Sequence, residues 1–168
     1  MTIFGKETMK APTLSLIAAA FILAAPVFAA DTDTPKPEPK KDAILEDARG
    51  AIAQKDWTRA QSLLKQGLNR NAGNADYHNL YAYSLRKSGN PDMNLVFKHY
   101  NEALRLDASH RGAHEYIGEA YLMVGNLPKA KEHLAALDRL CLLPCAEYRD
   151  LKKAVADFET RRSAAAPQ

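Results

Sequence analysis

The stretch YIGEAYLMVGNLPKAKEHL, residues 116–134, decides the fold class of this chain. Its apolar residues recur every three or four positions on either side of Gly125 and Asn126, which is the spacing of two amphipathic helices joined by a short turn. Gly118 and Ala130 stand within the two helices, where small side chains let neighbouring helices approach closely. The stretch therefore predicts a tight helical hairpin.

The same pattern continues outward from this hairpin. Between residues 43 and 162, apolar stripes at helical spacing are broken near residues 55–56, 71–74, 89–92, 107–110, 125–126 and 142–144. The breaks delimit seven helical segments. No stretch alternates apolar and polar residues with the period of two that is typical of a strand. Segments of this length are unstable alone, so they must pack against one another. We therefore predict an all-α fold.

The helical segments are also periodic. Ala60, Val96 and Ala130 occupy the same position in three successive hairpins, 36 and then 34 residues apart. This pattern resembles the tetratricopeptide repeat (TPR), a 34-residue helix-turn-helix unit with W-x2-L-G-x2-Y in its first helix and A-x3-F in its second. The third hairpin matches best, through Gly118-x2-Tyr121 and Ala130. The second matches less closely, and the first matches mainly at its second helix.

The resemblance implies a solenoid of antiparallel hairpins in a right-handed superhelical stack. We expect the helical domain to span residues 42–161, with a flexible tail at 162–168. Within it, the expected units are repeats at about 41–74, 75–110 and 111–144 and a terminal helix at 145–161. A plain helical bundle is the alternative.

Several positions depart from the family's pattern. Ile44, His78 and His114 stand where the first helix usually opens with an aromatic residue. Ala72 and Ala108 replace the proline of the turn between repeats. The fold tolerates these changes because small residues remain at the helix crossings.

Residues 1–29 are predicted to be a cleaved signal peptide. Lys6 and Lys10 precede an uncharged run at residues 14–25, and small residues precede a cleavage point after Ala29. An uncleaved membrane anchor is the alternative, but the run is shorter than the roughly 20 residues that span a bilayer. Residues 30–41 are proline-rich and predict a disordered linker. We expect export, most simply to the periplasm or by secretion, and no membrane span after cleavage.

The resemblance also implies where a partner would bind, because the first helix of each repeat lines a concave groove in this family. Asn79, Tyr83 and Arg86 share one face of one such helix and could hold a peptide backbone or an acidic tail. A solvated polar face is the alternative. The lysine, asparagine and arginine clamp that some members use for carboxylates is absent, since its positions hold Leu45, Arg49, Leu80, Gly112 and Tyr116. The predicted groove residues are Arg49, Asp76, Asn79, Tyr83, Arg86, Lys87, Glu115 and Glu119.

The chain has two cysteines, Cys141 and Cys145. Paired thiols in an exported protein are usually oxidised, and the proline-marked turn between these two could bring their Cα atoms within disulfide range. We expect a disulfide that staples the last repeat to the terminal helix. A redox or metal-binding role for the pair is the alternative.

Five histidines raise the question of a metal site. His78 and His114 are equivalent by repeat register, and His99 and His133 share a position on the second helices. His110 is four residues before His114 but falls in a turn, which makes joint ligation doubtful. Repeated placement favours packing between helices, so we expect neither a metal site nor a cofactor.

Composition and motifs restrict the function further. Lys and Arg number 23 against 20 Asp and Glu, and the net charge of +3 is interspersed, which argues against nucleic acid as the partner. No Ser-His-Asp order, phosphate loop or H-E-x-x-H pattern occurs, so we do not expect an enzyme. We predict a scaffold module of the cell envelope that binds a partner protein or peptide. A metal- or redox-handling accessory protein is the alternative, and a homo-oligomer stacked through its exposed ends is the third class.

Overall fold

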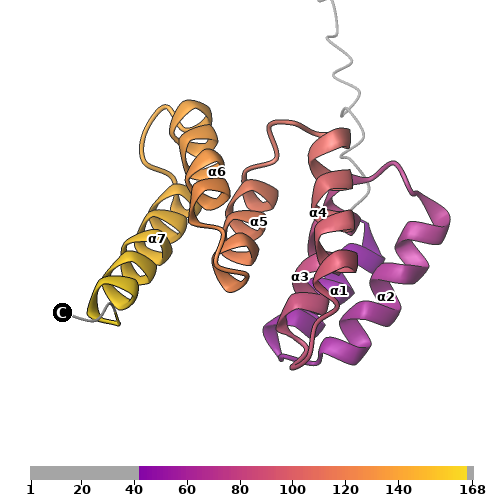
Figure 1. Ribbon diagram of the computed structural model, residues 1–168. Helices are drawn as coiled ribbons and strands as arrows, with labels where there is room; N and C mark the ends of the chain where they lie inside the picture. The colour runs from indigo at the N-terminus through magenta and orange to yellow at the C-terminus, as the bar shows by residue number, and fades with distance from the viewer. Residues whose placement is uncertain (1–41, 166–168) are drawn as a thin grey trace, which may run out of the picture. The chain divides into compact units, whose positions relative to one another are not determined.

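The computed structural model describes residues 42–165, and Figure 1 shows their helices. The all-α prediction is confirmed, because this part of the chain contains helices and no strand. Each predicted break lies between two helices, whereas the predicted signal peptide and linker lie outside the described residues. The helices are α1 (Ala43–Ala53), α2 (Trp57–Arg70), α3 (Ala75–Lys87), α4 (Met93–Leu106), α5 (Arg111–Met123), α6 (Leu127–Leu140) and α7 (Ala146–Ala164).

The last helix is longer than the sequence pattern predicted. It continues through Ala164, so the expected flexible tail at 162–168 is wrong for residues 162–164. Two basic residues, Arg161 and Arg162, stand in its last turn, where positive charge interacts favourably with the helix dipole. The Ser163 hydroxyl also donates to the Glu159 carbonyl at 3.0 Å. The last three residues of the chain lie outside the described part.

The helix starts are encoded locally. At α5, the His110 ring accepts a hydrogen bond from the Ala113 amide at 3.1 Å. The turn between α5 and α6 contains Gly125 at φ 75°, a backbone conformation that glycine adopts without strain. Five other helices begin at a carboxylate or amide side chain that accepts from the first-turn amides: Asp42, Asp56, Asn74, Asp92 and Asn126.

The helices form two layers. Helices α1, α3, α5 and α7 contact one another in succession, whereas α2, α4 and α6 make no contact with each other within residues 42–165. Each of these three packs instead on its hairpin partner and on the next odd-numbered helix. Because one layer is in contact and the other is spread, the stack curves toward the odd-numbered helices. We call the side formed by α1, α3, α5 and α7 the inner surface.

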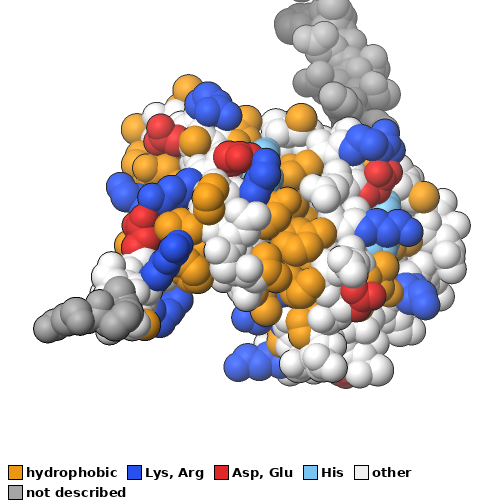
Figure 2. All heavy atoms as spheres, in the orientation of Figure 1, with side chains coloured by type: hydrophobic (Ala, Val, Ile, Leu, Met, Phe, Trp, Pro, Cys, Tyr) orange, Lys and Arg blue, Asp and Glu red, His pale blue; other side chains and the backbone are white. Residues whose placement is uncertain are grey.

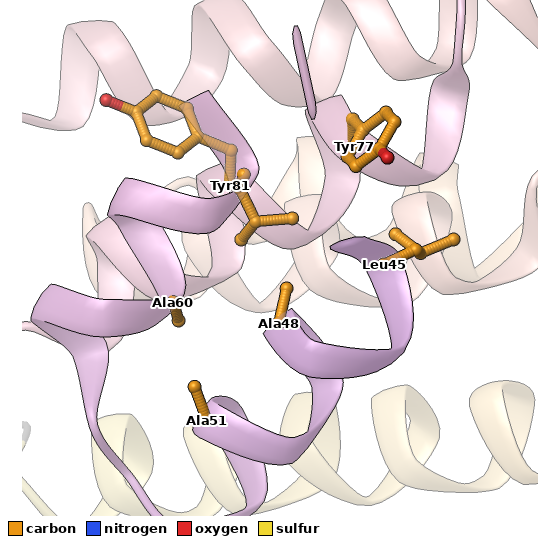
Figure 3. Packing of buried hydrophobic residues seen from close by; sticks show 7 residues of the cluster. Leu45, Ala48, Ala51, Ala60, Tyr77 and Tyr81 are labelled. Carbon is orange, nitrogen blue, oxygen red and sulfur yellow. The ribbon is translucent and has the colours of Figure 1, made fainter. Parts of the chain in front are cut away.

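Small residues set the helix spacing in the core. In the first hairpin, Ala48 and Ala51 of α1 and Ala60 of α2 are buried together (Figure 3). Because their side chains are short, the two helices approach closely. Tyr77 and Tyr81 of α3 belong to the same cluster. Two further hydrophobic clusters continue the core along the stack.

The terminal helix packs where a fourth repeat would begin. Gly118 in α5 faces Leu151 of α7, whose side chain is fully buried. A Cβ atom at Gly118 would lie 2.6 Å from Leu151 Cδ2, which no real contact tolerates. The missing side chain at this glycine therefore permits the close packing of α5 and α7.

We expect Gly118→Val to lower the free energy of unfolding by about 2 kcal/mol, because the added side chain collides with the buried Leu151 side chain. Urea denaturation measures the change. Gly50→Ala in α1 is the matched control, since nothing lies within 4 Å of its added methyl group. The control should stabilise the protein by up to about 1 kcal/mol through helix propensity. A Gly118→Val variant as stable as wild type would contradict the close contact.

Candidate functional site

All eight predicted groove residues lie on the inner helices, but they differ in exposure. One comes from α1, five from α3 and two from α5. Burial separates those that can meet a partner from those that support the surface beneath. Arg49 and Lys87 are exposed, Asp76, Tyr83 and Glu119 are half-buried, and Asn79, Arg86 and Glu115 are buried.

Arg86 is the centre of a buried polar cluster that joins three helices. Its Nη2 lies 2.6 Å from the Glu119 carboxylate of α5, and its Nε donates to the Tyr100 hydroxyl of α4 at 3.2 Å. Only 4% of the Arg86 side chain is exposed, against 29% of Glu119. The guanidinium therefore fastens repeat 2 to repeat 3 and is not free to bind a partner's acidic tail.

Aromatic rings form the half-buried part of the inner surface. Tyr83 of α3 and Tyr116 of α5 lie with ring centroids 4.6 Å apart, and Trp57 meets the Tyr83 ring edge-on at 6.1 Å. Arg86 lies 5.5 Å from the Tyr83 centroid, and the Lys87 ammonium 5.9 Å from it. Burial raises the pKa of Tyr83, and burial followed by the Glu115 charge raises that of Tyr116 to about 12. Both phenols are therefore neutral hydrogen-bond donors near pH 7.

Two buried acceptors occupy equivalent positions in successive repeats. Asn79 of α3 is 4% exposed, and its Oδ1 has no hydrogen-bond partner among the described residues. Glu115 of α5 is 9% exposed. Burial, followed by the negative charges of Glu119, Asp150 and Glu147, raises the pKa of Glu115 to about 8. The Glu115 carboxyl is therefore mostly protonated at pH 7.

Asp76 belongs to a second polar cluster at the start of α3. Its carboxylate lies 3.2 Å from His110 Nε2 and 3.5 Å from Arg49 Nη2. The hydrogen bond with His110, and then the Arg49 charge, hold the pKa of Asp76 below its usual range. A hollow of about 370 Å³ adjoins this cluster, lined by residues including Asp76, His110, Arg111 and Glu147. Sequence analysis missed His110 here, because its contact with Asp76 joins residues 34 positions apart in the sequence.

The terminal helix adds groove residues that sequence analysis also missed. A second hollow, of about 290 Å³, lies between α3, α5 and α7. Helix α7 contributes Phe158 and Arg161, which face Arg86 and Glu119 across it. The apolar residues Ala154 and Phe158, one helical turn apart, were the available signal, but α7 lacks the repeat register that would have assigned them to the inner surface.

Four of the five histidines form two pairs of the same geometry. His78 Nδ1 lies 2.9 Å from His99 Nδ1, and His114 Nδ1 lies 3.0 Å from His133 Nδ1. Burial, and then the neighbouring imidazole, lowers the pKa of His99 and of His133 to about 4. The pairs join α3 to α4 and α5 to α6, as repeat packing requires. Residues 42–165 contain no group of three or more His, Cys, Asp or Glu side chains placed to hold a metal ion.

Cys141 and Cys145 lie between α6 and α7 at disulfide distance, with Cα atoms 5.8 Å apart. The loop that they close exposes Leu142 and Leu143.

We expect reduction of this disulfide to lower the free energy of unfolding by about 2 kcal/mol or less, because the closed loop is short. Thermal melts with and without dithiothreitol measure the loss, and Cys141→Ser/Cys145→Ser is the control that dithiothreitol should not affect. Two reactive thiols in the unreduced protein would contradict the disulfide.

None of the helices within residues 42–165 has the length and apolar character needed to cross a membrane. No family model and no curated protein matches the sequence.

Solved structures do resemble the chain, and they are TPR domains and TPR-like chaperones. The Sgt2 TPR domain from Aspergillus fumigatus has a TM-score of 0.64 and 21% identity, covering 79% of this chain and 87% of its own. The TPR2B domain of yeast Sti1, solved in complex with pHsp70, has a TM-score of 0.62 and 18% identity, covering 72% and 100%. The Yersinia enterocolitica secretion chaperone SycD, in complex with a YopD peptide, has a TM-score of 0.58 and 14% identity, covering 73% and 92%. The predicted TPR-like solenoid is thereby confirmed as the fold of this chain.

Proposed function

We propose that this chain is a non-enzymatic interaction module that binds a segment of a partner protein on its inner surface. The observation that carries the proposal is the half-buried ring pair of Tyr83 and Tyr116, beside the exposed Lys87. Rigid aromatic rings offer contact area at little cost in conformational entropy, and their hydroxyls can donate to a peptide backbone. The complexes of Sti1 with pHsp70 and of SycD with a YopD peptide support this use of the fold.

The polar groups of the inner surface also favour binding over catalysis. Arg86 is engaged by Glu119 and Tyr100, and Asp76 is engaged by His110 and Arg49. Charged groups held in this way position helices and rings. This supports a scaffold that selects its partner by the shape of the inner surface, by Tyr83 and Tyr116, and by the exposed charges of Arg49 and Lys87.

The inner surface is tested by crosslinking and pull-down from the native host, comparing Tyr83→Ala and Lys87→Ala with wild type. Lys65→Ala on the outer helix α2 is the matched control, since Lys65 is also an exposed lysine. Both inner variants should lower recovery of the partner, and the control should leave it unchanged. Equal recovery with all four proteins would contradict the proposed surface.

We propose further that the protein is exported to the cell envelope, which the signal-like sequence of residues 1–29 supports. Amino-terminal sequencing of the protein from its host tests this. A first residue at Ala30 is expected, and retention of Met1 would contradict export by cleavage.

Self-association through the exposed ends of the helical stack is the competing proposal. Light scattering of the purified protein tests it.

A further inference from the structure

Three aromatic rings form a row that begins at α2 and crosses the inner helices α3 and α5. Trp57 of α2 meets the Tyr83 ring of α3 edge-on, with ring centroids 6.1 Å apart and planes at 69°. Tyr83 in turn lies 4.6 Å from Tyr116 of α5, with planes at 39°. All three residues are half-buried, so each has a packed part and an open part. We call these three residues the ring row.

The polar groups of the ring row are two phenol hydroxyls and one indole N–H. Hydrogen-bonded phenols occur elsewhere in residues 42–165, at Tyr77 and Tyr100. The three groups of the ring row make no hydrogen bond with another residue of this range. They are not sealed from solvent either, because the unbonded polar side-chain atom that is fully buried in this range is Asn79 Oδ1. The ring row therefore offers three hydrogen-bond donors to a ligand.

The acceptors beside the ring row are engaged or buried. Glu119 binds Arg86, whose guanidinium lies 5.5 Å from the Tyr83 centroid. Asn79, one helical turn before Tyr83, has its Oδ1 sealed from solvent, and Glu115 is 9% exposed. A segment that binds across the ring row therefore meets available donors and few available acceptors.

This imbalance selects a class of peptide. An ordinary extended segment brings one backbone N–H per residue, and each needs an acceptor once it is buried. A proline has a carbonyl but no N–H. The polyproline II helix makes no internal hydrogen bonds, so its carbonyls remain able to accept. Proline-rich segments in this conformation bind aromatic-lined surfaces, and the preformed helix loses little conformational entropy on binding.

Charge adds a smaller preference beside the ring row. The exposed Lys87 ammonium lies 5.9 Å from the Tyr83 centroid and has no ion-pair partner within residues 42–165. Figure 2 shows Lys and Arg side chains dispersed over one face of the molecule, so positive charge by itself does not mark a binding site. Next to the ring row, Lys87 favours a partner segment with an acidic residue among its prolines.

We propose that the partner segment is proline-rich and binds the ring row as a polyproline II helix, with its carbonyls accepting from Trp57, Tyr83 and Tyr116. This inference rests on the proposed function, because it names the kind of segment that the inner surface selects. A segment without prolines binds less tightly, since its N–H groups lose water and find few acceptors.

Titration of the purified protein with a blocked decaproline peptide tests the proposal. The readout is the fluorescence of Trp57, which is the only tryptophan of the chain. Decaproline should give a saturable change in emission. A blocked ten-residue Gly-Ser peptide, which is also uncharged, is the matched control and should bind at least about tenfold more weakly, a difference of about 1.4 kcal/mol.

Variants of one ring separate its two contributions. Tyr83→Ala should weaken decaproline binding about tenfold or more, because a ring contact is lost. Tyr83→Phe keeps the ring and loses one donor, so it should weaken binding roughly two- to tenfold. Tyr148→Ala, at a half-buried tyrosine of α7 outside the ring row, is the control and should bind like wild type. Circular dichroism confirms that each variant is folded.

The proposal is overturned by an unchanged Trp57 emission, by equal binding of the Gly-Ser peptide, or by wild-type binding in Tyr83→Ala. If Tyr83→Ala and Lys87→Ala still lose the natural partner in that case, the inner surface binds a segment of another class and the proposed function stands. If the natural partner is recovered equally with these variants, the proposed function fails, and this inference fails with it.

Discussion

We expect Glu119→Gln to lower the free energy of unfolding by about 3 kcal/mol, because it leaves the Arg86 guanidinium buried without its counter-charge. The pair spans α3 and α5 at 2.6 Å, and the arginine is almost inaccessible to water. Removing one partner of a buried ion pair costs about 3–5 kcal/mol, and the partial exposure of Glu119 places this pair at the lower end. Urea denaturation at pH 7 measures the loss.

A second ion pair, which is more exposed, separates the effect of burial on the free energy of unfolding from the effect of charge. Lys153 and Asp157 of α7 also lie 2.6 Å apart, but 76% of the lysine side chain and 47% of the aspartate side chain are exposed. Asp157→Asn should therefore cost less than about 0.5 kcal/mol. The double variant Arg86→Met/Glu119→Leu should recover most of the stability lost by Glu119→Gln, because no unpaired charge remains. Equal losses for Glu119→Gln and Asp157→Asn would contradict the account of Arg86.

We expect Glu115→Gln to be more stable than wild type in alkaline solution, by about 5 kcal/mol. The pKa of Glu115 is raised from 4.5 to about 8 by burial and by neighbouring carboxylates. Between these two values the folded protein holds a proton that the unfolded chain has released. The stability of wild type therefore falls as the pH rises from about 4.5 through 8. Glutamine cannot ionise and does not contribute to this fall.

The measurement is the free energy of unfolding at pH 5 and at pH 9, for wild type and Glu115→Gln. The difference between the two proteins should be small at pH 5 and largest at pH 9. Glu132→Gln, at an exposed position of α6, is the control and should follow the wild-type pH profile. A Glu115→Gln variant with the wild-type profile would show that the carboxyl is not desolvated.

Helix positions could be predicted from the sequence because the signals that set them are local. The Asp56 side chain caps α2 by accepting a hydrogen bond from the Arg59 amide. Gly125 adopts the left-handed backbone conformation in the turn between α5 and α6. Ala60 and Ala130 revealed the repeat because helix crossings require small residues at a fixed register. The end of α7 was placed too early because no such register extends into it.

The chemistry of the inner surface could not be predicted in the same way. Helical spacing placed Arg86 beside Tyr83 correctly, but it gave no information on Tyr100 and Glu119, which lie 14 and 33 residues away and bury the guanidinium. The equivalence of His78 and His114 was visible in the sequence. That His99 and His133 turn Nδ1 toward them depends on packing between two helices, which spacing along one helix does not specify.

Photocrosslinking at two positions tests the central claim, that a partner binds the inner surface. A benzoylphenylalanine is placed at Tyr83 on α3 in one protein and at the exposed Gln66 on the outer helix α2 in another. The account predicts a covalent partner adduct from position 83 and none from position 66. An adduct from position 66 with none from position 83 would contradict it.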